Sequence, residues 1–140
     1  MIDVVPQPSA PVLTKSPTSD AVCSGTDVSA TIFSNGSDGV AACADSYQYR
    51  TNNGTWSDYT PGDAISTTGF TSVDIRALRS DNTGAGCSSE NIYSWTVNAL
   101  PVPVISGNTL VCPNSTGNIY STASGMTNYD WDVTGGMITS

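Results

Sequence analysis

The chain has 140 residues, of which 11% are charged, and 12 acidic against 4 basic residues give it a net charge of −8. A nucleic-acid backbone or an anionic lipid surface requires several convergent cations, so this composition argues against both partners. No run of about 18 apolar residues is present, so insertion into a membrane is not expected.

Ser, Thr, Asn and Gly supply most of the polar surface, and no segment shows the apolar period of 3.6 residues that is typical of an amphipathic helix. This composition predicts an all-β protein of short strands and many turns. Residues 1–8 contain Pro6 and Pro8 and are predicted to be an N-terminal linker.

Short alternations of apolar and polar residues then recur along residues 9–100 and predict seven strands. Asn53-Gly54 is a hairpin signal within this series. The inward-facing residues are predicted to include Ile32, Ile75 and Trp95. The predicted strands lie in residues 11–15, 26–33, 46–51, 55–60, 61–69, 71–80 and 91–99. Their number and spacing predict an immunoglobulin-like β-sandwich over residues 9–100.

The sequence PVPV at residues 101–104 is predicted to be an interdomain joint. After it, sequence features of residues 9–100 recur. The stretch around Cys112 repeats that around Cys23, and the stretch around Tyr129 and Trp131 repeats that around Tyr47, at nearly the same offset. Residues 101–140 are therefore predicted to form an incomplete second sandwich, with a half-buried strand at 128–134. Such a partial domain would expose inner-face aromatic rings.

The four cysteines lie far apart, there is no histidine, and no CxxC pair is present, so zinc binding is not expected. Disulfides formed in an oxidising, extracellular compartment are the better interpretation. In an immunoglobulin-like topology Cys43 and Cys87 belong to the same end of the sandwich, and we favour that bond. Cys23–Cys87 is the competing pair, and Cys112 is expected to be unpaired or to have a partner outside this sequence.

No enzyme activity is expected. The absence of histidine excludes Ser-His and Cys-His machinery, and the acidic residues are scattered over turns and outward strand positions. No cofactor is predicted. Calcium is the one metal considered, with Asp38, Asp130 and Asp132 as weak candidate ligands that do not match an EF-hand spacing.

Two aromatic residues, Trp56 and Tyr59, follow the predicted hairpin turn and could form a platform for a sugar ring; the alternative is that Trp56 covers the edge of the core. Arg50, Asp74 and Arg76 are expected on the outward faces of neighbouring strands, as a cross-strand charge cluster.

The stretch YQYRTNNGTWSDYTPGDAISTTGFTSVDIRALR, with the closing NIYSWTVN, resembles a repeat of very large surface proteins from gliding and biofilm-forming Bacteroidetes. Residues 101–140 resemble the start of a PKD-like domain from the same class of protein. The resemblance implies a structural repeat of a cell-surface adhesin of the gliding-motility type, exported by type IX secretion.

Its partners would be neighbouring repeats of the same polypeptide or filament, and possible further partners are surface polysaccharides. The alternative is a carbohydrate-binding or spacer module of a secreted polysaccharide-degrading enzyme, since similar modules occur there. Both readings place the chain outside the cell.

Overall fold

The structure is a computed structural model, and it describes residues 4, 6–81, 88–125 and 128–139. The chain separates into two compact units, Met1–Leu100 (unit 1) and Pro101–Ser140 (unit 2). This division falls at the predicted joint, and each unit is described by itself. Whether unit 2 is part of a PKD-like sandwich stays a prediction.

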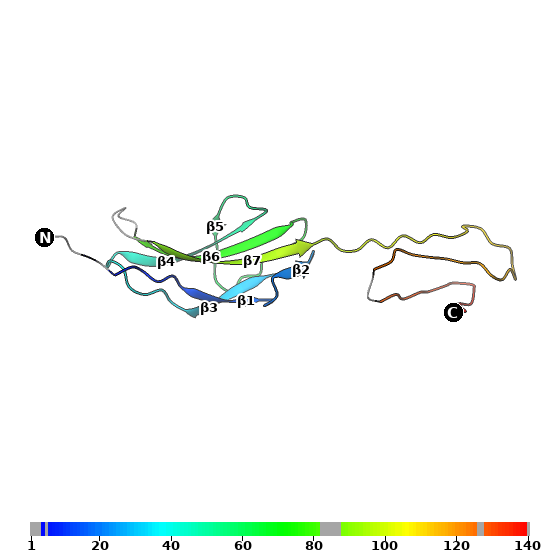
Figure 1. Cartoon of the computed structure of the whole chain (residues 1–140), viewed down its shortest axis with the longest axis horizontal. Coiled ribbons are helices and arrows are strands. Elements are labelled where there is room, and N and C mark those ends of the chain that lie inside the picture. Colours follow the sequence, from blue (N-terminus) through cyan, green and yellow to red (C-terminus); the bar gives the residue numbers. More distant parts are fainter. Residues whose placement is uncertain (1–3, 5, 82–87, 126–127, 140) are drawn as a thin grey trace. The chain divides into compact units, whose positions relative to one another are not determined.

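Unit 1 is all-β, and no helix is found among the described residues, so none of them forms a helix long and apolar enough to cross a membrane (Figure 1). Its strands are β1 (Val12–Ser16), β2 (Ala21–Cys23), β3 (Ser29–Ser34), β4 (Cys43–Thr51), β5 (Ser57–Asp58), β6 (Ser72–Asp81) and β7 (Ser89–Asn98).

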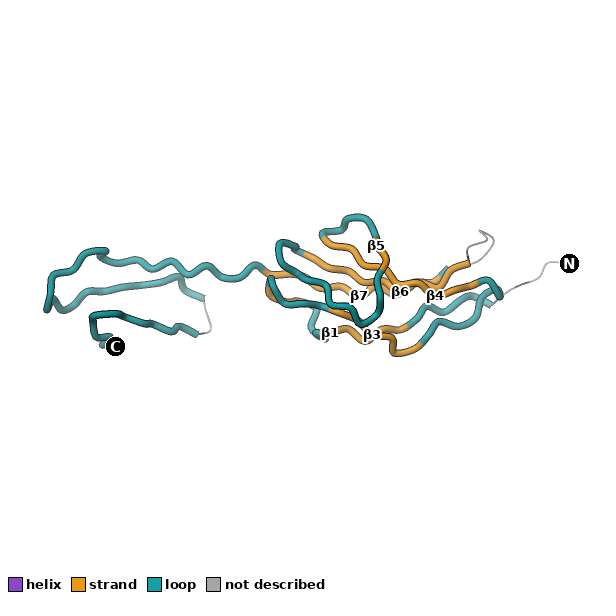
Figure 2. The backbone as a smooth tube through the Cα atoms, turned by 180° about the vertical axis from the view of Figure 1, so that it is seen from behind, coloured by secondary structure: helices purple, strands orange, loops and turns teal. Residues whose placement is uncertain are grey.

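These strands form two sheets that face each other (Figure 2). One contains β1 and β3, and the other has the order β2-β7-β6-β4-β5. Every pairing is antiparallel except that of β2 with β7, which is parallel. Consecutive β1 and β2 therefore belong to different sheets, and the chain crosses between them at residues 17–20.

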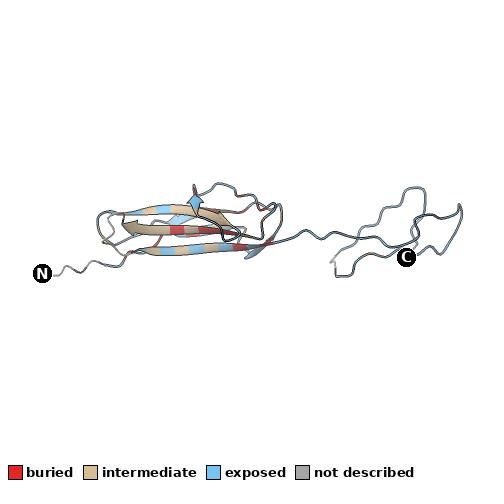
Figure 3. Cartoon of the chain, turned by 90° about the horizontal axis from the view of Figure 1, so that it is seen from above, coloured by how far each residue is buried: buried red, intermediate tan, exposed pale blue. Residues whose placement is uncertain are grey.

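The core lies between the sheets, where the inward residues of β6 and β7 meet those of β1 and β3 (Figure 3). Val73, Ile75 and Ala77 are fully buried, and Trp95 is 1% exposed. The alternation read from residues 71–80 and 91–99 is confirmed, because every second residue points inward. Ile32 departs from this prediction: it was expected inside but is 46% exposed, although it lies opposite the buried Leu13, and a bulge follows it in the β1–β3 pairing.

The strand predictions for residues 11–15, 46–51, 71–80 and 91–99 are confirmed. Two others are shorter than expected: the 26–33 strand begins only at Ser29, and the 55–60 strand is reduced to two residues. The 61–69 segment forms no strand and contributes an isolated bridge from Ile65 to Val28. Strand β2 was missed, because three residues are too few to show an alternation.

The connection between β4 and β5 contains a tight β-turn at residues 51–54, shifted by one residue from the expected pair, although the strands themselves pair only from Tyr49 and Ser57 onward. Asn52 and Asn53 both have positive φ, 50° and 55°, and the Gly54 amide donates to the Thr51 carbonyl over 2.9 Å. Two positive φ values in the central positions are typical of a type I′ turn, which Asn tolerates. The Asn52 side chain also accepts from the Thr71 amide at 2.8 Å, which ties this turn to the start of β6.

Tyr59 takes the place of a missing neighbour strand on the free edge of β3. Its hydroxyl accepts from the Ala30 amide at 2.9 Å and lies within hydrogen-bond distance of the carbonyls of Ala30 and Asp63. The Gly62 amide donates to the Ala30 carbonyl at 2.8 Å. One phenol thus satisfies buried backbone groups of β3 and fixes the path of residues 59–63.

Unit 2 contains no strand in its described residues, only a two-residue bridge between Ser106 and Ser121. The prediction of a half-buried strand at 128–134 is therefore wrong. Tyr129 and Trp131 are 44% and 38% exposed, and no neighbouring strand in the described residues pairs with this segment. Alternation of apolar and polar residues is insufficient for a strand when no partner supplies hydrogen bonds and a covering face.

Replacement of Tyr59 by Phe should lower the free energy of unfolding by about 1–3 kcal/mol, because the buried Ala30 amide loses the hydroxyl oxygen that accepts its hydrogen bond. Tyr47→Phe is the matched control: Tyr47 is only partly buried and packs against the same core. Urea unfolding of both variants measures the difference. Equal stability of the two would contradict the bridging function of the Tyr59 hydroxyl.

Candidate functional site

Residues 11–24 of unit 1 are bound along the length of its last strand. Three inward side chains of β7 reach the backbone of the N-terminal segment. Asn91 donates to the Pro11 carbonyl at 3.0 Å, and the Tyr93 hydroxyl accepts from the Leu13 amide at 2.8 Å. The indole Nε1 of Trp95 donates to the Pro17 carbonyl at 2.9 Å. Tyr93 and Trp95 thus combine core packing with a polar group that binds the backbone.

Main-chain bonds continue this contact beyond Pro17. The Thr96 amide donates to the Asp20 carbonyl, and the Ser24 amide donates to the Asn98 carbonyl, both at 2.8 Å. Partners advance in the same direction on both segments, because β2 is parallel to β7. We call this contact, between residues 11–24 and 91–98, the N-terminal seam.

Lys15 reinforces the middle of the N-terminal seam. Its ammonium group donates to the Ser94 carbonyl at 2.8 Å and lies 4.7 Å from the centre of the Trp95 ring. It also forms a 2.7 Å ion pair with Asp20, and this bond and the lysine charge lower the pKa of the fully exposed Asp20 carboxyl. A single cation therefore contacts β1, the crossing segment and β7.

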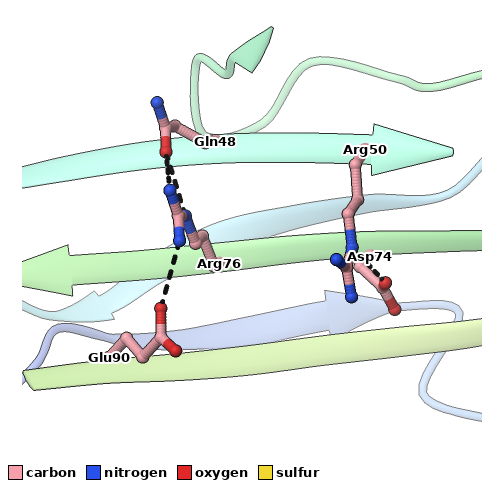
Figure 4. Close-up of polar contacts among 5 residues, drawn as sticks. All are labelled: Gln48, Arg50, Asp74, Arg76 and Glu90. Atoms are coloured by element: carbon pink, nitrogen blue, oxygen red, sulfur yellow. Dashed lines mark hydrogen bonds and ion pairs between the residues drawn. The ribbon is translucent and has the colours of Figure 1, made fainter. Parts of the chain in front are cut away.

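The outward face of the five-stranded sheet carries the expected cluster of charges (Figure 4). Arg50 and Asp74 are direct cross-strand partners and form a 2.8 Å ion pair. Arg76 lies opposite Gln48, donates to its Oε1 from Nε at 2.9 Å, and reaches Glu90 on β7 at 3.3 Å. The predicted cluster is confirmed, although Arg76 contacts Gln48 and Glu90 and makes no ion pair with Asp74.

Trp56 covers this cluster of charges. The guanidinium carbons of Arg50 and Arg76 lie 4.5 and 4.4 Å from the centre of its ring. Such stacking of cations on an indole stabilises by about 0.5–1 kcal/mol each at partly exposed positions. Trp56 is half-buried, but it packs on these two arginines and not on the edge of the core, where the alternative interpretation placed it.

The predicted platform of Trp56 and Tyr59 does not exist as one surface. Tyr59 is 8% exposed and belongs to the core, whereas Trp56 lies over the outward arginines. Spacing in the sequence placed both after the hairpin turn, but the two-residue strand β5 sends them to opposite sides of the sheet.

The loop that contains Asp38 is held by protein groups. Arg79 donates to the Asp38 carbonyl at 3.0 Å and forms a 2.8 Å ion pair with Asp45, whose other oxygen accepts from the Gly36 amide. Arg79 thus ties this loop to β4 and β6. Asp130 and Asp132 lie exposed in the strandless unit 2, and no group of three metal-ligating side chains gathers anywhere in the described ranges.

No disulfide joins Cys23, Cys43 and Cys112 to one another. Cys43 lies opposite Asp81 at one end of the sheet, and Cys23 lies beside Asn98 at the other end of β7. The favoured partner, Cys87, lies outside the described residues, so both Cys43–Cys87 and Cys23–Cys87 stay predictions.

An open cleft of about 420 Å³ lies beside β5, between the end of β4 and residues 59–70. Tyr49, Tyr59 and Phe70 form part of its wall, and Asp58 and Asp63 also line it. This cleft could not be predicted from the sequence, because residues 59–70, which line much of it, follow an irregular path with no strand pattern.

No family model matches this chain, and comparisons with curated proteins and with solved structures also find no match.

Loss of the Asp74 carboxylate should destabilise unit 1 far more than loss of the Glu90 carboxylate. The Asp74 side chain is 9% exposed, whereas that of Glu90 is 44% exposed. Asp74→Ala should therefore cost about 1–3 kcal/mol, because a half-buried guanidinium loses its acceptor. Glu90→Ala should cost less than about 1 kcal/mol. Thermal unfolding at low and high salt compares the two, and equal losses would contradict this ranking.

Peptide mapping of the non-reduced protein by mass spectrometry tests the disulfide prediction. We expect a peptide pair that links Cys43 to Cys87, because Cys43 lies at the end of the sheet where β6 ends. A Cys23–Cys87 pair, or three or more free thiols in protein purified from an oxidising compartment, would overturn this connectivity.

Proposed function

We propose that unit 1 is an immunoglobulin-like structural module that transmits force along an extracellular bacterial surface protein, as one repeat of an adhesin. The strand arrangement supports this assignment. Strands β1 and β3 share one sheet, β4 to β7 form the other, and the first segment moves from the former to the latter by way of β2. Immunoglobulin-like sandwiches likewise divide their strands between two sheets, although the first sheet has only two strands in the described part of this chain.

The N-terminal seam is the observation that carries the proposal. The segment begins near Ser9, which pairs with Ser37 at one end of the sandwich, and β7 ends at Asn98 at the other end (Figure 1). Tension applied through the two ends of unit 1 pulls the parallel strands β2 and β7 in opposite directions along their length. The bonds of the seam are then loaded together, whereas strands peeled from one end would lose them one by one.

The surface chemistry supports a structural module more than a catalytic one. All four basic side chains make ion pairs within unit 1, and these contacts tie strands or loops to one another. The carbohydrate-binding alternative draws little support from Trp56, since two guanidinium groups stack on its ring. The adhesin assignment itself rests on the resemblance of the sequence and on this geometry.

Single-molecule pulling through the ends of unit 1 tests the proposal. Lys15→Met should lower the unfolding force, because it removes the bond to the Ser94 carbonyl and the contact with Asp20. Tyr59→Phe, which lies outside the seam, is the control. For the same loss of equilibrium stability, we expect Lys15→Met to lower the unfolding force more than Tyr59→Phe does. Unfolding forces that follow equilibrium stability alone, or forces that do not change in Lys15→Met, would contradict the proposal.

A further inference from the structure

We propose that the cleft beside β5 binds one unit of a neutral saccharide, such as a hexose of a surface polysaccharide. Its volume of about 420 Å³ falls within the usual range of small-ligand sites. This binding function adds to the proposed mechanical function and does not depend on it, so either can fail alone.

The apolar wall of the cleft is fixed before any ligand arrives. Tyr59 is held by the hydrogen bonds of its hydroxyl to the backbone around Ala30 and Asp63. Tyr49 packs against it edge to face, with ring centres 6.4 Å apart at an angle of 64°. Phe70 is half-buried, and its amide donates to the Thr67 carbonyl at 3.1 Å. Preorganised aromatic rings offer contact area to the C–H face of a sugar at little entropic cost.

The polar part of the lining suits hydroxyl groups. The lining includes three residues with hydroxyl groups, Thr51, Thr60 and Ser66. It also includes two carboxylates that can accept hydrogen bonds, those of Asp58 and Asp63. Within the described residues, neither carboxylate takes part in an ion pair. Both are therefore available to a ligand.

The charge of the cleft selects among saccharides. Its lining includes two Asp residues and neither Lys nor Arg, and the whole chain carries a net charge of −8. An anionic saccharide would be repelled, whereas a neutral one leaves the carboxylates free to accept from vicinal hydroxyls. A small organic cation is the competing ligand for such a lining, and it serves as a separate arm of the test.

The test uses the full 140-residue chain, and the probes are tetrasaccharides of neutral glucan, mannan and xylan, with a uronic-acid tetrasaccharide and spermidine as comparisons. In ¹⁵N NMR titrations, a neutral probe should shift the amides of Thr51, Asp63 and Phe70 and leave that of Trp56 unchanged. Binding should be saturable, and a change from 50 to 300 mM salt should alter the affinity by less than about twofold, because no ion pair forms.

Variants distinguish binding in this cleft from binding to the ring of Trp56. Asp63→Asn and Phe70→Ala should each weaken binding by about tenfold or more, whereas Trp56→Ala should leave it unchanged. Asp63 is exposed, so its variant is expected to fold even if Phe70→Ala does not. Binding lost in Trp56→Ala alone, binding of spermidine or the uronic-acid probe alone, or no shift with any neutral probe at 10 mM would each overturn the proposal.

Discussion

The fold of unit 1 depends on the attachment of its first segment to its last strand. Residues 11–24 begin in one sheet and end in the other, and their backbone pairs with β3 in the first sheet and with β7 in the second. Inward polar atoms on β7, above all the Trp95 indole nitrogen and the Tyr93 hydroxyl, bind the backbone of the first segment across that edge. Burial of the same rings supplies the core, so one set of side chains closes the sandwich and fills it.

Ion pairs link strands and loops on the surface of unit 1. With 4 basic residues in 140, unit 1 uses each cation as a cross-link: Lys15 in the seam, Arg50 and Arg76 across the sheet, and Arg79 on the 35–39 loop. Trp56 shields two of these guanidinium groups from water, which strengthens their contacts with Asp74 and Gln48. Of the acidic residues outside these ion pairs, Asp27, Asp38 and Asp63 lie exposed in loops.

Much of the strand layout could be predicted from the sequence, because β4, β6 and β7 are long enough to show their alternation. The charge cluster could also be predicted, since it follows from that alternation. Strand β2 could not be predicted, because three residues are too few to show an alternation. The cleft could not be predicted either, because its wall depends on the hydrogen bonds of the Tyr59 hydroxyl. The error at 128–134 has a related cause: the sequence shows which face a strand would bury, but it does not supply the partner strand. The separation of Trp56 and Tyr59 could also have been predicted, since side chains three positions apart in a strand point to opposite faces.

Native-state hydrogen exchange measures most directly whether the seam is part of the cooperative core. The amides of Leu13, Ser24 and Thr96 donate seam bonds, and the amides of Val28 and Ile65 donate to each other's carbonyls inside the sandwich. If the seam closes the fold, all five amides should exchange only through global unfolding and should show the same free energy of opening. Exchange of the three seam amides through local opening, with a free energy several kcal/mol below that of Val28, would contradict this account.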